Sequence, residues 1–288
     1  MDETFEITGM YDYVFKKAFE NKDHLIPFLK IITGIDFSNM ELNFINTEKK
    51  SGESIKGIDA DIIAEFIDNA NDFNIVIDIE PQEYNLTDMS LLRREIHYAS
   101  LFFSDMYPEG SIYQEERKFY SIFLMDKYGE KGHPITKTVF HTEGTNQNSD
   151  IFCFYNIYLK QILSKDFKIK NENDKMILEV VRLLKAKDLS AYLNNDNKFL
   201  KGVAEVIDYV KGSKEERWAA IARYKAEQTK KNREAWAKEV GKEEGLKQGK
   251  EEQLIENIKN LHEAGFSNED IAKGLKIDIS CVEKSLKK

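Results

Sequence analysis

The sequence has few cysteines, few prolines and no long apolar run. Its 2 cysteines, Cys153 and Cys281, lie far apart and form no CxxC pair, which excludes a disulfide framework and argues against structural zinc. The content of only 4 prolines and 15 glycines is typical of a soluble globular protein rich in helix. With no stretch of about 18 apolar residues, a membrane span is not expected. The start of the chain is acidic and polar rather than signal-like, so we expect a cytoplasmic protein.

Basic residues are also scarce where the strands are expected. The formal net charge of the 288 residues is −9, and residues 1–210 carry 24 basic against 36 acidic side chains. Residues 211–260 carry 13 basic and 10 acidic side chains. Because phosphate binding depends largely on Lys and Arg, tight unspecific binding of DNA is not expected from the first part alone.

Two neighbouring segments predict strands that carry acids on one face. Residues 56–65 read Lys-Gly-Ile-Asp-Ala-Asp-Ile-Ile-Ala-Glu, residues 74–82 read Asn-Ile-Val-Ile-Asp-Ile-Glu-Pro-Gln, and the turn formers at 68–72 between them predict a hairpin. Alternate residues of a strand share a face. The polar residues that share faces are Asp59 with Asp61 on the first strand, and Asp78 with Glu80 and Gln82 on the second.

The predicted hairpin brings Asp61 and Glu80 close enough to hold one divalent cation. Hard cations such as Mg²⁺ prefer carboxylate oxygens. A bound cation can polarise a phosphoryl oxygen and deprotonate a water molecule. The two segments therefore indicate metal-dependent chemistry on a phosphate ester.

This pattern resembles the PD-(D/E)XK nucleases, and above all their Rpn branch of recombination-promoting nucleases or transposases. That branch carries Gly-x-x-x-Asp on the first strand and Glu-x-Gln on the second. The matching residues here are Gly57, Asp61, Glu80 and Gln82.

Further segments extend the resemblance over most of the chain. The branch has a helix that opens with arginine and contains a Tyr-Tyr pair; residues 92–100 match it with Arg94 and Tyr98, whereas His97 replaces one tyrosine. The other similar segments are residues 12–19, residues 110–113, the strand expected over 120–126, and the Gly/Lys/Glu tail near residue 245.

The resemblance implies a restriction-endonuclease-like α/β fold and a metal-dependent DNA endonuclease linked to recombination or mobile elements. Asp61 and Glu80 would then be catalytic ligands of Mg²⁺, Mn²⁺ or Ca²⁺. Gln82 would be the third catalytic residue and would help to place the attacking water. DNA is the implied partner.

Two residues leave a second function open, namely a catalytically inactive nuclease fold that binds DNA or a protein. Gln82 stands where most of the superfamily has lysine, and glutamine can position water but carries no charge. Pro81 removes a ladder donor inside the strand. The strand is therefore expected to bend or end there, or the site to be distorted.

Four residues are candidates for auxiliary roles, each with an alternative. Asp59 and Asp78 are either further metal ligands or surface acids. Asp12 either approaches the site from the first helix or caps that helix. Arg94 either contacts a DNA phosphate, which suits its planar fork, or pairs with a carboxylate of the site.

The chain is expected to comprise an α/β mixed-sheet core followed by a helical C-terminal region. Residues 10–33 predict one helix that ends at Gly34, and a second helix is expected from Thr87 or Asp88 to about Met106. The expected divisions are a nuclease-like core over 5–165, a helical extension over 166–212, a charged helix or linker over 213–265 and a helix-turn-helix-like unit over 266–288.

The C-terminal region predicts a homo-oligomer. The apolar stripe of residues 254–261 must be covered, and self-association with a second copy is the simplest cover. A dimer would also present two active sites to one DNA. The terminal unit then either completes this contact or touches DNA through its last helix. Trp218 and Trp236 are expected to pack between helices.

Overall fold

A computed structural model describes residues 6–44, 62–69, 73–82, 87–107, 116–129 and 132–286, and its strands form one mixed sheet. The order of the strands is β1-β2-β3-β4-β6-β5. Neighbours from β1 to β3 are antiparallel, β3, β4 and β6 run parallel, and β5 pairs antiparallel with β6. This confirms the predicted α/β fold with a mixed sheet. The strands are β1 (Glu41–Phe44), β2 (Ile62–Asp68), β3 (Phe73–Gln82), β4 (Glu116–Met125), β5 (Ile135–His141) and β6 (Asn148–Tyr158).

The hairpin expected from the acid-bearing segments is present as β2 and β3. Ile62 lies opposite Ile79 at one end of the pair, and Asp68 lies opposite Phe73 at the other. Beyond Ile79, β3 continues along β4 and ends at Gln82, directly after Pro81. Pro81 lies inside this strand, opposite Leu124 of β4, so the strand does not end at the proline itself.

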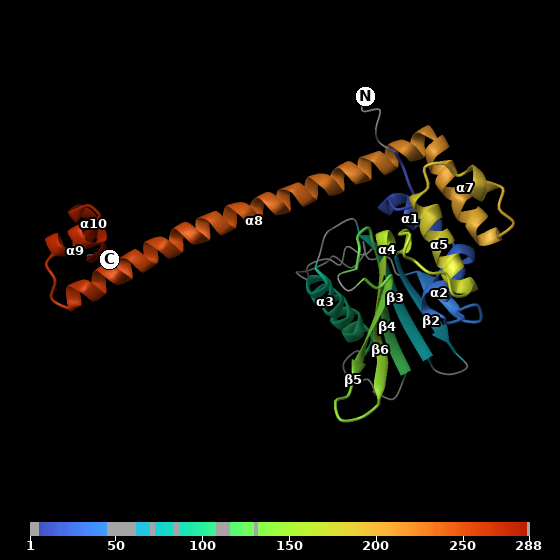
Figure 1. Ribbon diagram of the computed structural model, residues 1–288, viewed down its shortest axis with the longest axis horizontal. Coiled ribbons are helices and arrows are strands. Elements are labelled where there is room, and N and C mark those ends of the chain that lie inside the picture. The colour runs from blue at the N-terminus through green and yellow to red at the C-terminus, as the bar shows by residue number, and fades with distance from the viewer. Residues whose placement is uncertain are drawn as a thin grey trace. The chain divides into compact units, whose positions relative to one another are not determined.

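Helices cover both faces of the sheet, and the two layers differ (Figure 1). On one face, Ile75, Ile77 and Ile79 of β3 join the large apolar core together with residues of several helices. On the other face, Val76 packs with Tyr98 of a single helix, α3. The helices of the larger layer are α1 (Asp12–Phe19), α2 (Lys22–Thr33), α4 (Leu159–Ile162), α5 (Glu172–Lys185), α6 (Ser190–Leu193) and α7 (Lys198–Gly212), and that of the other is α3 (Asp88–Met106).

The single helix expected over residues 10–33 is wrong, because α1 and α2 are separate. Asn21 lies between them, and its side chain accepts a hydrogen bond of 3.0 Å from the backbone N–H of Asp23. Asparagine is a favoured N-cap, so it begins a new helix here. Two other predicted helix ends are confirmed. Gly34 ends α2 with φ 77°, and Thr87 Oγ1 caps α3 by accepting from the N–H of Ser90 at 3.2 Å.

The charged stretch after residue 213 is a single helix, α8 (Lys214–Glu263), and not a linker. The chain divides into two compact units, Met1–Tyr224 and Lys225–Lys288. In the first unit, Glu216 of α8 accepts hydrogen bonds from Tyr13 Oη and Lys17 Nζ of α1, both at 2.6 Å. The expectation that both tryptophans are packed is wrong, since Trp218 is 59% and Trp236 68% exposed.

The second unit has its own small core. Ile258 of α8 is fully buried against Ile271 of α9 (Asn268–Leu275) and Val282 of α10 (Ile279–Leu286). The chain's own last two helices therefore cover the apolar stripe of α8. Self-association was the simplest cover expected for this stripe, and it is not needed for that purpose.

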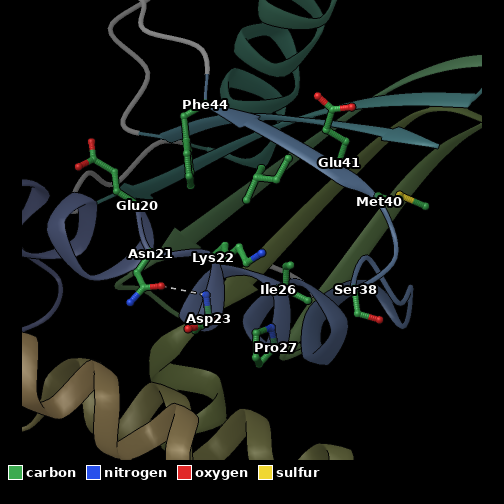
Figure 2. Close-up of a pocket in the computed structure, with 11 residues that line it drawn as sticks. Glu20, Asn21, Lys22, Asp23, Ile26, Pro27, Ser38, Met40, Glu41 and Phe44 are labelled. Atoms are coloured by element: carbon green, nitrogen blue, oxygen red, sulfur yellow. Dashed lines mark hydrogen bonds between the residues drawn. The ribbon is translucent and has the colours of Figure 1, made fainter. Parts of the chain in front are cut away.

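A groove of about 740 Å³ lies between α2 and the edge strand β1 (Figure 2). Its apolar lining includes Ile26, Leu42 and Phe44, and its acids include Glu20 and Asp23. Ile26 and Leu42 also pack against the large core. The groove thus lies on the α2 side of the sheet, opposite to α3.

The close contact between α2 and α7 gives a testable consequence of this packing. A Cβ at Gly202 would lie 2.4 Å from His24 Nε2, and this ring is buried and hydrogen-bonded through Nδ1 to the carbonyl oxygen of Ala18 at 2.8 Å. We expect Gly202→Ala to lower the free energy of unfolding by about 1–3 kcal/mol in urea denaturation. Gly212→Ala is the matched control on α7, because a Cβ there meets no atom within 4 Å. An equal loss in both variants would contradict the packing explanation.

Candidate active site

The acids of β3 lie beneath α3. Asp78 is 0% and Glu80 5% exposed, and both alternate along the strand with isoleucines that face the large core. Asp78 is therefore not a surface acid, and that alternative is wrong. Burying carboxylates is costly unless they are paired or protonated.

Arg94 of α3 reaches Glu80 across the interface between helix and sheet. Its Nη2 forms an ion pair with Oε1 of Glu80. The same guanidinium donates hydrogen bonds to Tyr98 Oη, from Nη2 at 3.0 Å and from Nε at 3.3 Å. Arg94 and Tyr98 are four residues apart, so they are neighbours on one face of the helix. Of the two alternatives for Arg94, the structure shows the pairing with a site carboxylate.

Burial controls the protonation of this cluster. It raises the pKa of Asp78 to about 7, although the charge of Arg94 opposes the rise. It also raises the pKa of Tyr98 to about 12, helped by the charge of Glu80. Burial alone would lower the pKa of Arg94, but the charge of Glu80, together with Tyr98 and Asp78, outweighs it and the pKa is raised. Arg94 is thus a permanent cation, whereas Asp78 can gain or lose a proton near neutral pH.

Further buried polar residues on this face were not predicted as site residues, and they include Glu95, Ser121 and Asn156. Glu95 of α3 and Ser121 of β4 are each 0% exposed, and Ser121 lies beside Asp78 in the strand register. Glu95 had a recognisable signal, because it occupies a helical core position between Leu91 and Tyr98, both of which are buried. Ser121 had none, since a small polar residue in an apolar strand is ordinary.

The remaining predicted residues lie in different places. Asp59 and Asp61 fall outside the described residues. Gln82 is the last residue of β3, beside Met125 of β4. Asp12 is the first residue of α1, whose buried side chains belong to the large core on the opposite face.

The described residues supply some, but not all, of the ligands that a divalent cation needs. They include no group of three or more His, Cys, Asp or Glu side chains placed to hold a metal. However, neither carboxylate oxygen of Asp78 has a hydrogen-bond partner among the described residues, and the same holds for Ser121 Oγ. Buried oxygens without donors suit a cation. The donor set near Glu80 therefore fits a divalent ion if one more carboxylate is supplied.

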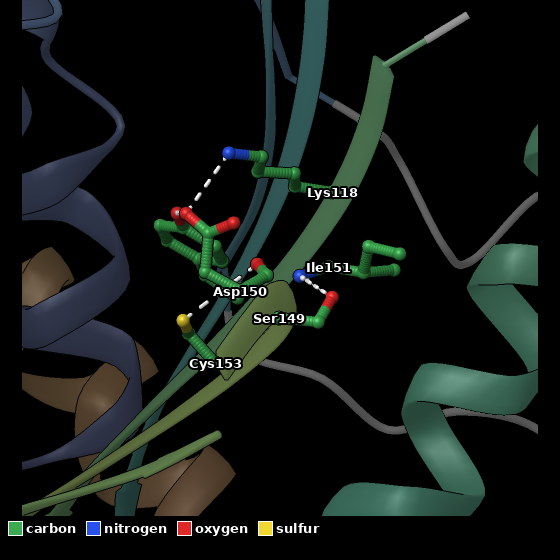
Figure 3. A network of polar contacts seen from close by, with 6 residues as sticks. Lys118, Ser149, Asp150, Ile151 and Cys153 are labelled. Atoms are coloured by element: carbon green, nitrogen blue, oxygen red, sulfur yellow. Dashed lines mark hydrogen bonds and ion pairs between the residues drawn. The ribbon is translucent and has the colours of Figure 1, made fainter. Parts of the chain in front are cut away.

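A second polar network lies on the large-core side, as Figure 3 shows. Asp150 Oδ2 is 2.9 Å from Lys118 Nζ and accepts a hydrogen bond from Tyr120 Oη at 3.3 Å. Burial alone would raise the pKa of Asp150, but Lys118 holds it below its ordinary value. Cys153 Sγ contacts the carbonyl oxygen of Asp150 at 3.7 Å. The carboxylate of Asp150 is thus paired with a cation, whereas the oxygens of Asp78 have no hydrogen-bond partner among the described residues.

Comparison of the sequence with known protein families gives a match. A family model described as PD-(D/E)XK nuclease family transposase matches residues 9–235. The chain belongs to this family. The match covers the whole sheet and α3, confirms the resemblance read from the sequence and supports a role related to nucleases or transposases. Searches of curated proteins and of solved structures give no match. Among the helices that the structure describes, none is long and apolar enough to cross a membrane.

The raised pKa of Asp78 predicts a pH-dependent stability. Its pKa rises from 3.8 to about 7 in the folded protein, so between these values the folded state binds more protons than the unfolded state, and stability falls as pH increases. Asparagine cannot titrate. In urea unfolding with a chelator present, we expect the stability of Asp78→Asn relative to the unsubstituted protein to increase up to about pH 7 and then stay level. A difference that does not vary with pH would show that Asp78 is already ionised in the folded protein.

Proposed function

We propose that the protein is a metal-dependent endonuclease that hydrolyses phosphodiester bonds in DNA, in recombination or in the movement of mobile elements. The observation that carries this proposal is the buried pair Asp78 and Glu80 beneath α3, with Arg94 beside it, inside the region that matches the family. Buried acids next to a permanent cation suit a site that handles a metal and a phosphate.

The proposed ligands of Mg²⁺, Mn²⁺ or Ca²⁺ are Asp61 and Glu80, with Asp78 as an auxiliary acid. In the sequence, Asp61 directly precedes Ile62 and Glu80 directly follows Ile79. Ile62 and Ile79 lie opposite each other in the β2–β3 ladder. This register supports the assignment, because it adds the carboxylate that the described acids lack.

Each side chain then has a distinct role. When bound, a divalent cation would supply polarisation of a phosphoryl oxygen and activation of water. Gln82 orients the attacking water through its amide. Asp78, with a pKa of about 7, can take up a proton at neutral pH. Arg94 supplies a planar donor fork that matches a phosphate.

Plasmid cleavage tests the catalytic assignment. With Mg²⁺, Mn²⁺ or Ca²⁺ present, we expect the unsubstituted protein to cleave DNA and Asp61→Ala and Glu80→Ala to lose about 100-fold or more of the rate. Gln82→Ala should cause a smaller loss, since water can partly replace an amide. Glu41→Ala, which removes an exposed acid of β1, is the control and should cleave normally. Equal cleavage by all variants would refute the assignment.

A catalytically inactive module that binds DNA or a protein is the second candidate. The uncharged Gln82 and the excess of acids in residues 1–210 favour it. Metal binding separates the two functions. If calorimetry detects no Mg²⁺ or Mn²⁺ binding near millimolar concentration, and neither ion raises the melting temperature, the binding module becomes the better assignment.

We further propose a homodimer or larger assembly, although the stripe that ends α8 is covered within the chain. A dimer would present two active sites to one DNA, as cutting both strands requires, and Trp236 and Leu246 of α8, 68% and 58% exposed, are the side chains that we would expect at its contact. We expect light scattering at tens of micromolar to give at least twice the monomer mass, and Trp236→Glu to reduce it. A monomeric full-length protein would remove this proposal.

A further inference from the structure

The ion pair of Glu80 is built from an accessible cation above a buried anion. The side chain of Arg94 is 27% exposed, whereas that of Glu80 is 6% exposed. Solvent and its ions therefore reach the guanidinium more readily than the carboxylate. A phosphate that approaches this face of the protein meets the donors of Arg94 first.

The guanidinium is held in place independently of Glu80. It lies 5.2 Å from the ring centroid of Tyr98 and 5.7 Å from that of Phe123. It also donates to Tyr98 Oη at 3.0 and 3.3 Å. Cation–π contacts and hydrogen bonds of this kind orient the planar fork. Arg94 can thus exchange one anionic partner for another without leaving its position on α3.

Arg94 and a divalent ion would compete for the carboxylate of Glu80. Its Oε1 accepts from Arg94 Nη2, so a metal that bound through Oε1 would have to displace the guanidinium. A guanidinium and a divalent cation at the same carboxylate also repel each other, and this repulsion is strong in a buried place. The described acids around Glu80 form no group of three that could hold a metal against this competition.

On the basis of the proposed function, we propose that Arg94 holds the Glu80 carboxylate until a phosphate of DNA takes over its guanidinium, so that DNA binding and metal binding are coupled. Phosphodiester oxygens match the donor fork as well as a carboxylate does. Arg94 is in this role a positioning residue for Glu80. Because coupling between two ligands is reciprocal, the metal must also strengthen DNA binding.

Calorimetric titration with MnCl₂ in the absence of DNA tests the first half of this coupling. We expect Arg94→Gln to bind Mn²⁺ about 5-fold or more tightly than the unsubstituted protein, because Glu80 is released, and yet to cleave plasmid more slowly. Arg94→Lys keeps the charge and should bind Mn²⁺ as weakly as the unsubstituted protein. Arg93→Gln is the matched control, an exposed neighbour with the same change of charge, and should alter neither property. Circular dichroism checks that each variant is folded.

Addition of DNA tests the second half. A duplex oligonucleotide should strengthen Mn²⁺ binding to the unsubstituted protein but not to Arg94→Gln, and inorganic phosphate at equal phosphate concentration should have a smaller effect. An unchanged or lower Mn²⁺ affinity of folded Arg94→Gln would overturn the inference, and so would equal strengthening by DNA in both proteins.

The Glu80→Ala variant distinguishes failure of this inference from failure of the proposed function. If it abolishes cleavage and weakens Mn²⁺ binding while Arg94→Gln does not differ from the unsubstituted protein, only the coupling fails. If Glu80→Ala changes neither, the proposed function fails as well.

Discussion

The ion pair between Arg94 and Glu80 is the interaction on which the α3 side of the sheet depends. Three acids, Asp78, Glu80 and Glu95, are at most 5% exposed on this side, and an uncompensated buried charge costs several kcal/mol. One guanidinium relieves part of this cost. A proton on Asp78 relieves another part, since its pKa is raised to about 7. The arrangement therefore compensates buried acids from within the chain and keeps the Glu80 carboxylate beside a positive charge.

The unequal layers of the fold make this arrangement possible. The helices opposite α3 share a continuous apolar core with alternate residues of β2, β3, β4 and β6, and hydrophobic burial of this extent is the main stabilising contribution in a domain. The α3 layer has smaller clusters, which the buried acids separate. Because the large core holds β3 from one face, its other face can carry polar residues that weaken local packing.

Local sequence signals predicted the parts of the fold that local physics controls. Alternation along β3 gave the shared face of Asp78 and Glu80, and the cap at Thr87 gave the start of α3. Failures occurred where a distant segment decides the outcome. Asn21 divides a helical pattern that periodicity alone makes continuous. The burial of Ile258 depends on helices that begin ten or more residues later, and the burial of Asp78 depends on α3 lying across the strand. Neither follows from alternation within one strand.

The ion pair between Arg94 and Glu80 also affects how Gln82, which stands where lysine is usual in the superfamily, is interpreted. A Glu-x-Gln strand carries no cation of its own, so under the proposed function any positive charge beside a bound phosphate would come from elsewhere in the fold. Arg94 approaches Glu80 from the helix instead of the strand, and its contacts with Tyr98 and Phe123 keep it there. A guanidinium stays charged at every pH at which the protein is folded. Glutamine in place of lysine thus leaves β3 without a cation while Arg94 still provides one beside Glu80, and in the proposed mechanism the placement of water and the supply of charge belong to two different residues.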